Sequence, residues 1–373
     1  MRLAIATPFL ETYGGMEKVV LRIAKHFNAD IYCIRYNPEQ TYPEFQDINI
    51  NVKESFIGNL PPRRVSTAIE AGNYFLNLKL DYDLINAHQT PAEWTANNNN
   101  VLWYCHSPNR EAYDLYEWRM SRRNLISRLA FYPSIQAFKH IEAKLVPKIG
   151  TILTNSKNSQ SRIKKFLNRD SEILHPAVDN KFRYKDNEQF FFYPSRIAPE
   201  KDFEYAITAF AETGKDLAGW KLVIAGAVAP RHEPYLRKLE LLAEKLCVPN
   251  SVRILPNVSE EQLIDFYSRC HSVLYTSINE DYGLVPLEAM ASGKICIAKD
   301  EGGAKETIDD GVDGFRERDW FRFKDRLIWA TENTEECIRM GKIGQDKVKK
   351  HFTWDAFMKK FEEKVKDGMK KLI

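Results

Sequence analysis

The sequence has no closely spaced pair of cysteines, no long apolar run and no strong excess of either charge. Its six cysteines are scattered, whereas zinc sites need closely spaced ligands and disulfide scaffolds are short and cysteine-rich. We therefore expect six free thiols in a reducing compartment. The formal net charge of +3 gives no reason to expect nucleic-acid binding.

Signals for export and membrane insertion are also missing. The first apolar run, Leu3–Ala6, is too short for a signal peptide and is followed closely by Pro8. No window approaches the ~18 apolar residues of a membrane-spanning helix. These absences predict a cytoplasmic protein, whose contact with a membrane would be peripheral.

Short apolar runs alternate with helix-length amphipathic stretches, which is typical of parallel βα units. A chain of 373 residues is long enough for two domains. We predict an α/β fold with two doubly wound, Rossmann-like domains, residues 1–178 and 189–352, facing across a cleft. Residues 175–188 are polar and read as the linker. The tail, 353–373, carries one apolar helical stripe and is expected to pack back on the first domain.

The expected strands are nearly all short and apolar throughout, as in sheets covered by helices on both faces. They are Leu3–Ala6, Ile31–Ile34, Leu84–Ala87, Val101–Tyr104, Thr151–Thr154, Phe190–Pro194, Lys221–Ala225, Val252–Leu255, Ser272–Tyr275 and Ile295–Ala298.

The most specific motif runs from Glu280 to Gly293, after the expected strand Ser272–Tyr275. Gly283 permits a close backbone approach, and the amides near Leu284 and Val285 would form an anion site at a helix start. Glu280 and Glu288 would accept hydrogen bonds from sugar hydroxyls. The simpler alternative is that Glu288 favours the helix dipole and Glu280 is a solvated loop residue.

Two cations follow the expected strand Phe190–Pro194. Arg196 and Lys201 lie five residues apart in a loop, where they can converge on a pyrophosphate. Together they would stabilise a departing nucleoside diphosphate without a metal. Taken separately, a loop arginine and lysine more often face solvent.

Two further candidates belong to the first half of the chain. Gly14 and Gly15 lie between the first strand and first helix, where backbone amides can approach a phosphate, although a plain tight turn explains them equally well. His106 ends the strand Val101–Tyr104 and His88 ends Leu84–Ala87, so each can face the cleft. A lone histidine is more often structural.

The pair Asp81 and Asp83 matches the DxD pattern that holds a metal–diphosphate in many glycosyltransferases. A metal-binding DxD should follow its strand, whereas this one precedes Leu84–Ala87. We therefore expect it at the opposite edge of the sheet from the cleft, and we expect no metal or other cofactor.

In combination these elements resemble family 4 of the retaining glycosyltransferases, which have the GT-B architecture. Glu280 and Glu288 match its E-x7-E signature, and Arg196 and Lys201 its R-x4-K pair. Gly14-Gly15 matches the diglycine donor loop and His106 the cleft histidine. Asp202 departs from the family, which more often has Gly or Asn there, and so does Asp281-Tyr282.

The resemblance implies a role for each matching position. Glu280 would contact the transferred sugar and Glu288 the ribose, while Arg196, Lys201 and a Gly15 amide would neutralise the diphosphate. The backbone of Gly283, Leu284 and Val285 would line the sugar and phosphate. His106 would bond the sugar and help stabilise the transition state.

The sequence segments around His106 and Glu280 most resemble those of the mannosyltransferase branch that uses GDP-mannose. UDP-sugars are the alternative donors. The acceptor would be a glycan or a lipid-linked sugar. Residues 119–148 hold seven Lys/Arg and one carboxylate, which suits either peripheral contact with an anionic membrane or a solvated helical face. Rival functions are an epimerase or hydrolase with the same fold and a non-catalytic nucleotide-sugar-binding subunit. A nicotinamide oxidoreductase would need a GxGxxG turn, and we find none.

Overall fold

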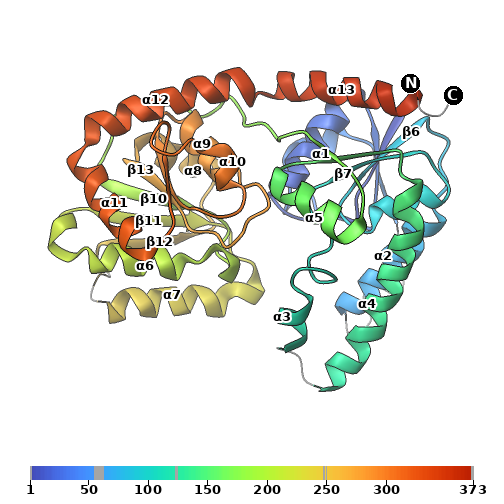
Figure 1. The fold of residues 1–373 in the computed structure, drawn as a ribbon, viewed down its shortest axis with the longest axis horizontal. Helices are drawn as coiled ribbons and strands as arrows, with labels where there is room; N and C mark the ends of the chain where they lie inside the picture. Colours follow the sequence, from blue (N-terminus) through green and yellow to red (C-terminus); the bar gives the residue numbers. More distant parts are fainter. Residues whose placement is uncertain (1, 54–62, 122–124, 247, 249, 371–373) are drawn as a thin grey trace. The chain divides into compact units, whose positions relative to one another are not determined.

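The computed structural model describes residues 2–53, 63–121, 125–246, 248 and 250–370. The chain forms two compact units, each with its own sheet and core (Figure 1). Unit 1 comprises Met1–Pro176 and Asp355–Ile373, and unit 2 comprises Ala177–Trp354.

Unit 1 is built on a parallel sheet of seven strands in the order β5-β3-β1-β6-β7-β8-β9. Their bounds are β1 Leu3–Ala6, β3 Asp30–Cys33, β5 Ile50–Val52, β6 Leu84–His88, β7 Val101–Cys105, β8 Thr151–Thr154 and β9 Glu172–Ile173, and a separate pair is formed by β2 Phe9–Leu10 and β4 Arg35–Tyr36. The helices are α1 Gly15–Phe27, α2 Arg63–Asn77, α3 Tyr116–Ser121, α4 Leu125–Leu145, α5 Lys157–Leu167 and α13 Trp354–Lys370, with short 3₁₀ helices at Pro43–Asp47, Ala92–Asn97 and Val146–Lys148.

Unit 2 is built on a parallel sheet of six strands in the order β12-β11-β10-β13-β14-β15. The strands are β10 Phe190–Pro194, β11 Lys221–Gly226, β12 Val252–Pro256, β13 Ser272–Tyr275, β14 Ile295–Lys299 and β15 Phe315–Glu317. The helices are α6 Phe203–Glu212, α7 Glu233–Lys245, α8 Glu260–Arg269, α9 Val285–Ala291, α10 Ala304–Thr307, α11 Trp320–Glu332 and α12 Thr334–His351, and the 3₁₀ helices are η4 Pro199–Lys201, η5 Gly214–Leu217 and η6 Pro230–His232.

Helices cover both faces of the sheet in unit 2. α6 and α7 lie on one face and α8 and α9 on the other (Figure 1), as right-handed connections between parallel strands require. All residues of β10 and β13 are therefore buried. The predicted α/β class, with two Rossmann-like parallel sheets, is confirmed.

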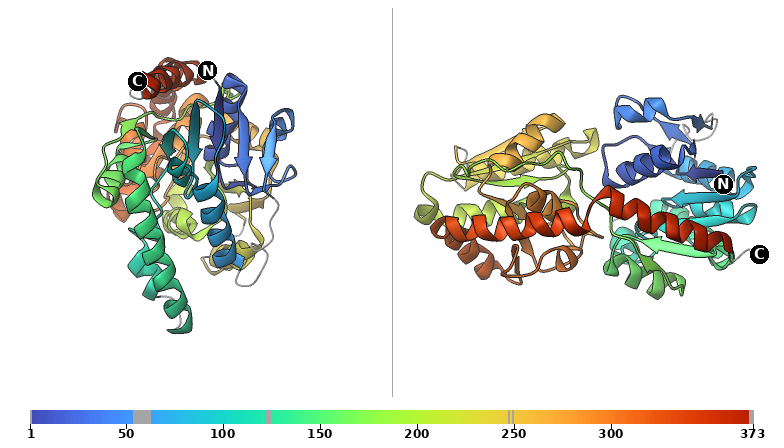
Figure 2. Two further views of the ribbon diagram at one scale, coloured as in Figure 1. Left: turned by 90° about the vertical axis from the view of Figure 1, so that its right-hand side faces the viewer. Right: turned by 90° about the horizontal axis from the view of Figure 1, so that it is seen from above.

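The last helix, α13, packs on unit 1, as the apolar stripe of the tail predicts (Figure 2). Phe361 is fully buried, with its ring 5.8 Å from the ring of Phe27. Phe357 lies 6.1 Å from Tyr104, again between ring centroids. At the surface, His26 Nε2 lies 2.6 Å from a carboxylate oxygen of Glu362.

Most of the stretch expected to be a linker belongs to unit 2. The boundary between the units falls between Pro176 and Ala177, and the chain after it is bonded to α8 and the turn that follows. The amide of Lys185 donates to the carbonyl of Ser268 at 3.0 Å, and the ring of Phe182 meets that of Tyr267 at 5.3 Å. The polar composition therefore marks a surface segment rather than a free connector.

Candidate functional site

In unit 2 the strand order reverses between β10 and β13. The chain runs outward from β10 through β11 to β12, then returns to place β13 on the other side of β10. Loops leaving such a switch point diverge, and α/β proteins bind ligands in the crevice that results. The loop after β10 carries Arg196 and Lys201, and the loop after β13 carries Glu280.

Lys201 and Glu280 form an ion pair at this switch point. The lysine side chain is only 8% exposed, whereas the carboxylate side chain is 30% exposed. The structure thus brings together two of the predicted site residues, which are 79 positions apart in sequence. A buried ammonium fixed by a carboxylate is a preorganised positive charge.

The loop that carries Lys201 is held by the side chains of Tyr193, in β10, and Thr276, directly after β13. The hydroxyl of Tyr193 donates to the carbonyl of Lys201 and accepts from the amide of Thr276 at 3.1 Å. The hydroxyl of Thr276 donates to the carbonyl of Asp202 at 2.8 Å. These bonds tie the β10 loop to the β13 loop.

Asp202 adopts a left-handed conformation, with φ of 53° and ψ of 48°. Gly and Asn enter this region most easily, and Asp tolerates it. The departure at Asp202 from the family resemblance therefore keeps the required backbone. Its carboxylate also lies 3.2 Å from Lys299 Nζ at the end of β14.

Arg196 is exposed, near the start of the same loop. In the part of the chain that the structure describes, no ion pair involves its guanidinium. Unlike the ammonium of Lys201, this charge is not already engaged by a carboxylate. It remains accessible to an anionic ligand from solvent.

The backbone conformation of the turn before α9 requires a glycine at position 283. Its φ is +77°, and an added Cβ would lie 2.1 Å from the hydroxyl oxygen of Tyr275. Leu284 and Val285 follow it at the start of α9, where the first N–H groups lack intrahelical acceptors. Glu288 lies in the first turn and accepts a 2.6 Å bond from the hydroxyl of Tyr267.

One supporting element was missed by sequence reasoning. Glu301-Gly302-Gly303 follows β14 and packs against the loop of Glu280. The amide of Gly303 donates to the carbonyl of Glu280 at 3.0 Å, and the amide of Asn279 donates to the carboxylate of Glu301 at 3.1 Å. A Cβ at Gly302 would lie 2.5 Å from the carbonyl oxygen of Glu280. A diglycine shortly after an apolar strand was the available signal.

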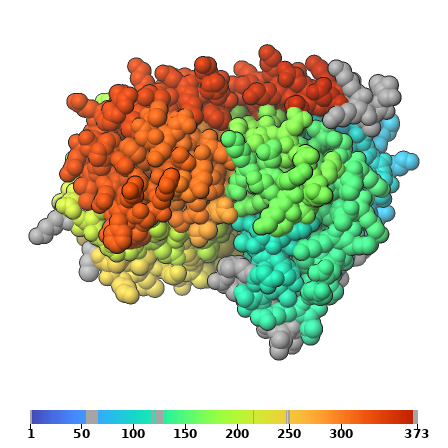
Figure 3. All heavy atoms as spheres, in the orientation of Figure 1, coloured from blue at the N-terminus to red at the C-terminus, as the bar shows by residue number. Residues whose placement is uncertain are grey.

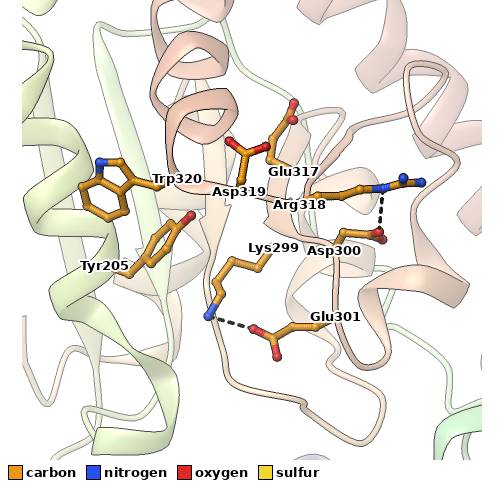
Figure 4. Close-up of a pocket in the computed structure, with 8 residues that line it drawn as sticks. All are labelled: Tyr205, Lys299, Asp300, Glu301, Glu317, Arg318, Asp319 and Trp320. Carbon is orange, nitrogen blue, oxygen red and sulfur yellow. Dashed lines mark ion pairs between the residues drawn. The ribbon is translucent and has the colours of Figure 1, made fainter.

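A polar hollow of about 250 Å³ lies near these loops (Figure 4). Its charges are already used in ion pairs, Lys299 with Glu301 at 2.7 Å and Arg318 with Asp300 at 3.3 Å. Because its carboxylates outnumber its cations, it is a poor receptor for a diphosphate. Its pairs support the neighbouring loops instead.

In unit 1 the strand order reverses between β1 and β6. Gly14 and Gly15, which follow the β1–β2 segment, start α1. A Cβ at Gly14 would lie 2.3 Å from a carboxylate oxygen of Glu17, whose other oxygen accepts from the Thr12 hydroxyl at 2.6 Å. Gly14 therefore gives room to a carboxylate at the helix start.

His106 follows β7 and is partly buried. Its Nε2 lies 3.1 Å from Nδ1 of His88, and burial lowers the pKa of His106 to about 3. His88 is fully buried, so it does not present its own ring to a ligand as sequence reasoning suggested. Burial also lowers its pKa well below the ordinary value. Both imidazoles are neutral at physiological pH.

Asp81 and Asp83 lie at the amino-terminal edge of the sheet in unit 1. Asp81 forms a 2.9 Å ion pair with Arg2, and Asp83 accepts from the Arg2 amide at 2.7 Å. Both precede β6, so they are at the opposite edge from the loops that carry the site residues, as their position in the sequence predicts.

The basic stretch 119–148 includes the end of α3, all of α4 and the 3₁₀ helix Val146–Lys148, and α4 extends beyond the sheet of unit 1 (Figures 1 and 2). Its surface is in view in Figure 3. Phe131 packs inward, whereas Leu129 is 76% and Tyr132 53% exposed. Arg122 and Arg123 lie outside the described residues. Among the helices described, none has the length and apolarity needed to cross a bilayer.

Comparison with known proteins agrees with the fold. Residues 176–347 match the family described as glycosyl transferases group 1. The chain is 27% identical to an alpha-1,3/1,6-mannosyltransferase of Schizosaccharomyces pombe, over 73% of this chain and 59% of that protein. It is 24% identical to the enzyme of the same name in Dictyostelium discoideum, over 98% of both chains.

Among solved structures, HepE of Anabaena in complex with UDP and glucose has a TM-score of 0.77 and 18% identity, covering 98% of this chain and 100% of that one. The fold is therefore that of the GT-B glycosyltransferases. The match to the group 1 glycosyl transferases falls almost wholly within unit 2, and the chain is similar to alpha-1,3/1,6-mannosyltransferases, a similarity that its motifs predict. It spans about three fifths of the length of the fission yeast relative.

Proposed function

We propose that this chain is a retaining, metal-independent glycosyltransferase that moves mannose from GDP-mannose to a glycan or lipid-linked acceptor. The observation that carries the proposal is the Lys201–Glu280 pair at the switch point of unit 2, with the exposed cation of Arg196 on the same loop. The similarity to alpha-1,3/1,6-mannosyltransferases supports mannose as the sugar.

Each side chain has a defined task in this reaction. Arg196 and Lys201 bind the diphosphate, and their charge stabilises it as the bond from its oxygen to the sugar C1 breaks. Glu280 accepts hydrogen bonds from sugar hydroxyls while it holds the ammonium of Lys201 in place. The acceptor oxygen bonds to C1 on the same face, and its proton passes to the leaving phosphate oxygen. His106 forms a hydrogen bond with the sugar.

A thermal-shift panel with GDP, UDP, ADP and their sugars tests the donor. A ligand that binds only the folded state at 100 times its Kd adds about 2.7 kcal/mol of stability. For a domain of this size that is roughly 5–10 °C. We expect GDP and GDP-mannose to give the largest shift. A shift with UDP compounds alone would replace GDP-mannose by a UDP-sugar, which the UDP-bound HepE structure makes the second candidate.

Product analysis then tests transfer. With GDP-mannose and a lipid-linked acceptor we expect a mannosylated product of retained configuration, also in the presence of EDTA. Sugar released or epimerised without an acceptor would indicate a hydrolase or epimerase. Donor binding without any product, across glycan and lipid-linked acceptors, would indicate a non-catalytic subunit.

Lys201→Ala tests the diphosphate role. We expect turnover to fall at least 100-fold, because one charge-assisted contact to developing negative charge is lost. Lys238→Ala is the matched control, since this exposed lysine of unit 2 pairs with Glu204 at 2.9 Å. Full activity of Lys201→Ala would refute the role.

We further propose that α4 rests on the anionic cytoplasmic face of a membrane, where a lipid-linked acceptor would be found. The exposed Leu129 and Tyr132 lie among basic residues, and Glu142, the single carboxylate of the stretch, is fully buried. Co-sedimentation with phosphatidylserine vesicles at low salt, lost at high salt and in Leu129→Glu, is expected. Absence of binding at low salt would end this idea.

A further inference from the structure

Behind His106 lies a chain of polar side chains that the proposed reaction does not use. Asn86 and His88 are alternate residues of β6, so they share one face of the strand, and both are fully buried. Nε2 of His88 lies 2.7 Å from Oδ1 of Asn86, and Nδ1 of His88 lies 3.1 Å from Nε2 of His106. The three side chains thus form one continuous row of hydrogen bonds.

The direction of this row is set by the neighbouring strand. The side-chain amide of Asn86 donates to the carbonyl of Leu102 on β7 at 3.1 Å, so its oxygen must face His88. The opposite amide orientation would place two acceptors, Oδ1 and the Leu102 carbonyl, against each other in the protein interior, which is costly. Asn86 is therefore an acceptor toward His88.

An acceptor at one end determines where each imidazole carries its proton. Nε2 of His88 must be the N–H that donates to Asn86, and in a neutral ring Nδ1 is then an acceptor. Nε2 of His106 must therefore carry the hydrogen and donate it to Nδ1 of His88. In a neutral ring, Nδ1 of His106 then has no hydrogen. The ring of Tyr104 is stacked on His88, with 5.5 Å between ring centroids, and covers one face of that imidazole.

We propose that Asn86 and His88 are positioning residues that fix His106 in the tautomer with a bare Nδ1, so that His106 accepts a hydrogen bond from its ligand and cannot donate one. The identification of this ligand as the sugar of a nucleotide donor rests on the proposed function. The sugar hydroxyl that meets His106 must then be the hydrogen-bond donor.

The tautomer is tested first in the ligand-free full chain by ¹⁵N NMR of the imidazoles, with His106 assigned through His106→Gln. We expect a protonated Nε2 and an unprotonated Nδ1 on His106. Asn86→Leu removes the acceptor at similar volume, and His106 should then show both tautomers. Asn49→Leu, which alters an exposed asparagine of unit 1, should leave the spectrum unchanged. A protonated Nδ1 in the wild-type chain overturns the proposal, whatever the chain catalyses.

The consequence for the ligand is tested with donor analogues. At the hydroxyl that His106 contacts, deoxy and deoxyfluoro donors should be equally poor, because neither can donate. If His106 were a donor, the fluorinated sugar would be the better of the two. Asn86→Leu should lower kcat about tenfold, the size of one hydrogen bond, with little change in donor KM. Unchanged kcat with the expected tautomer would remove the positioning role and leave the proposed function standing. Absence of transfer by the wild-type chain would remove the proposed function and leave the tautomer result intact.

Discussion

Replacing Glu280 should destabilise unit 2 far more than replacing Lys201, although the two side chains form one ion pair. Removing the carboxylate in Glu280→Ala leaves the ammonium, which is 8% exposed, without its partner. Breaking a buried pair in this way costs about 3–5 kcal/mol. Lys201→Met keeps the apolar stem and leaves a carboxylate that is 30% exposed and hydrated, which should cost about 1 kcal/mol.

For a unit of this size these values correspond to a fall in unfolding temperature of roughly 6–20 °C for Glu280→Ala and about 2–4 °C for Lys201→Met. Calorimetry of the ligand-free chain measures both. The double variant leaves neither charge of this pair, so it should be more stable than Glu280→Ala alone. Replacement of Lys238, whose side chain is 67% exposed, provides the control and should cost under about 1 kcal/mol. Additive losses in the double variant, or a greater loss from Lys201→Met, would refute the reasoning.

Three further outcomes are expected. Gly283→Ala should cost about 2–4 kcal/mol, and Tyr275→Phe should restore only part of this loss, because the ring carbon Cζ would still lie 2.8 Å from the new Cβ and the positive φ would remain, as thermal unfolding will show. Burial raises the pKa of Glu142 to about 7, so its ionisation lowers stability as the pH rises from 4.5 through 7. Glu142→Gln should therefore be more stable than wild type at pH 8, by at most about 3 kcal/mol, and should lose this advantage below pH 4.5; urea unfolding without such a difference would contradict the burial argument. Phe361→Ala should cost about 3–5 kcal/mol in unit 1 only, and hydrogen exchange that weakened unit 2 equally would disprove this.

The central strands could be predicted because burial on both faces makes them apolar throughout. Leu3–Ala6, Phe190–Pro194 and Ser272–Tyr275 have the predicted bounds. Five strands were missed. Of these, β5, β9 and β15 are two or three residues long and lie at the edges of the two large sheets, and β2 and β4 are two-residue strands that pair only with each other. An edge strand has a neighbour on one side only and is less buried, so its sequence carries little apolar signal.

The loops that carry the site could also be predicted, because motif residues followed expected strands. The contact between Lys201 and Glu280 could not, since it depends on β10 and β13 being neighbours in the sheet. His88 was expected to face a ligand, but its position within β6 places it in the interior behind His106. Sequence position shows which strand end a residue occupies, and packing decides which side chain reaches the surface.

Unit 1 is assembled from two stretches of chain that are separated by the whole of unit 2. During synthesis on the ribosome, residues 177–354 emerge as one uninterrupted stretch and can close their core at once. The side chains of Phe27 and Tyr104 can be covered only after α13, which packs on them, has been made. Unit 1 can therefore complete its core only after residues 177–354 have been made, which departs from the usual amino-terminal-first order of domain folding.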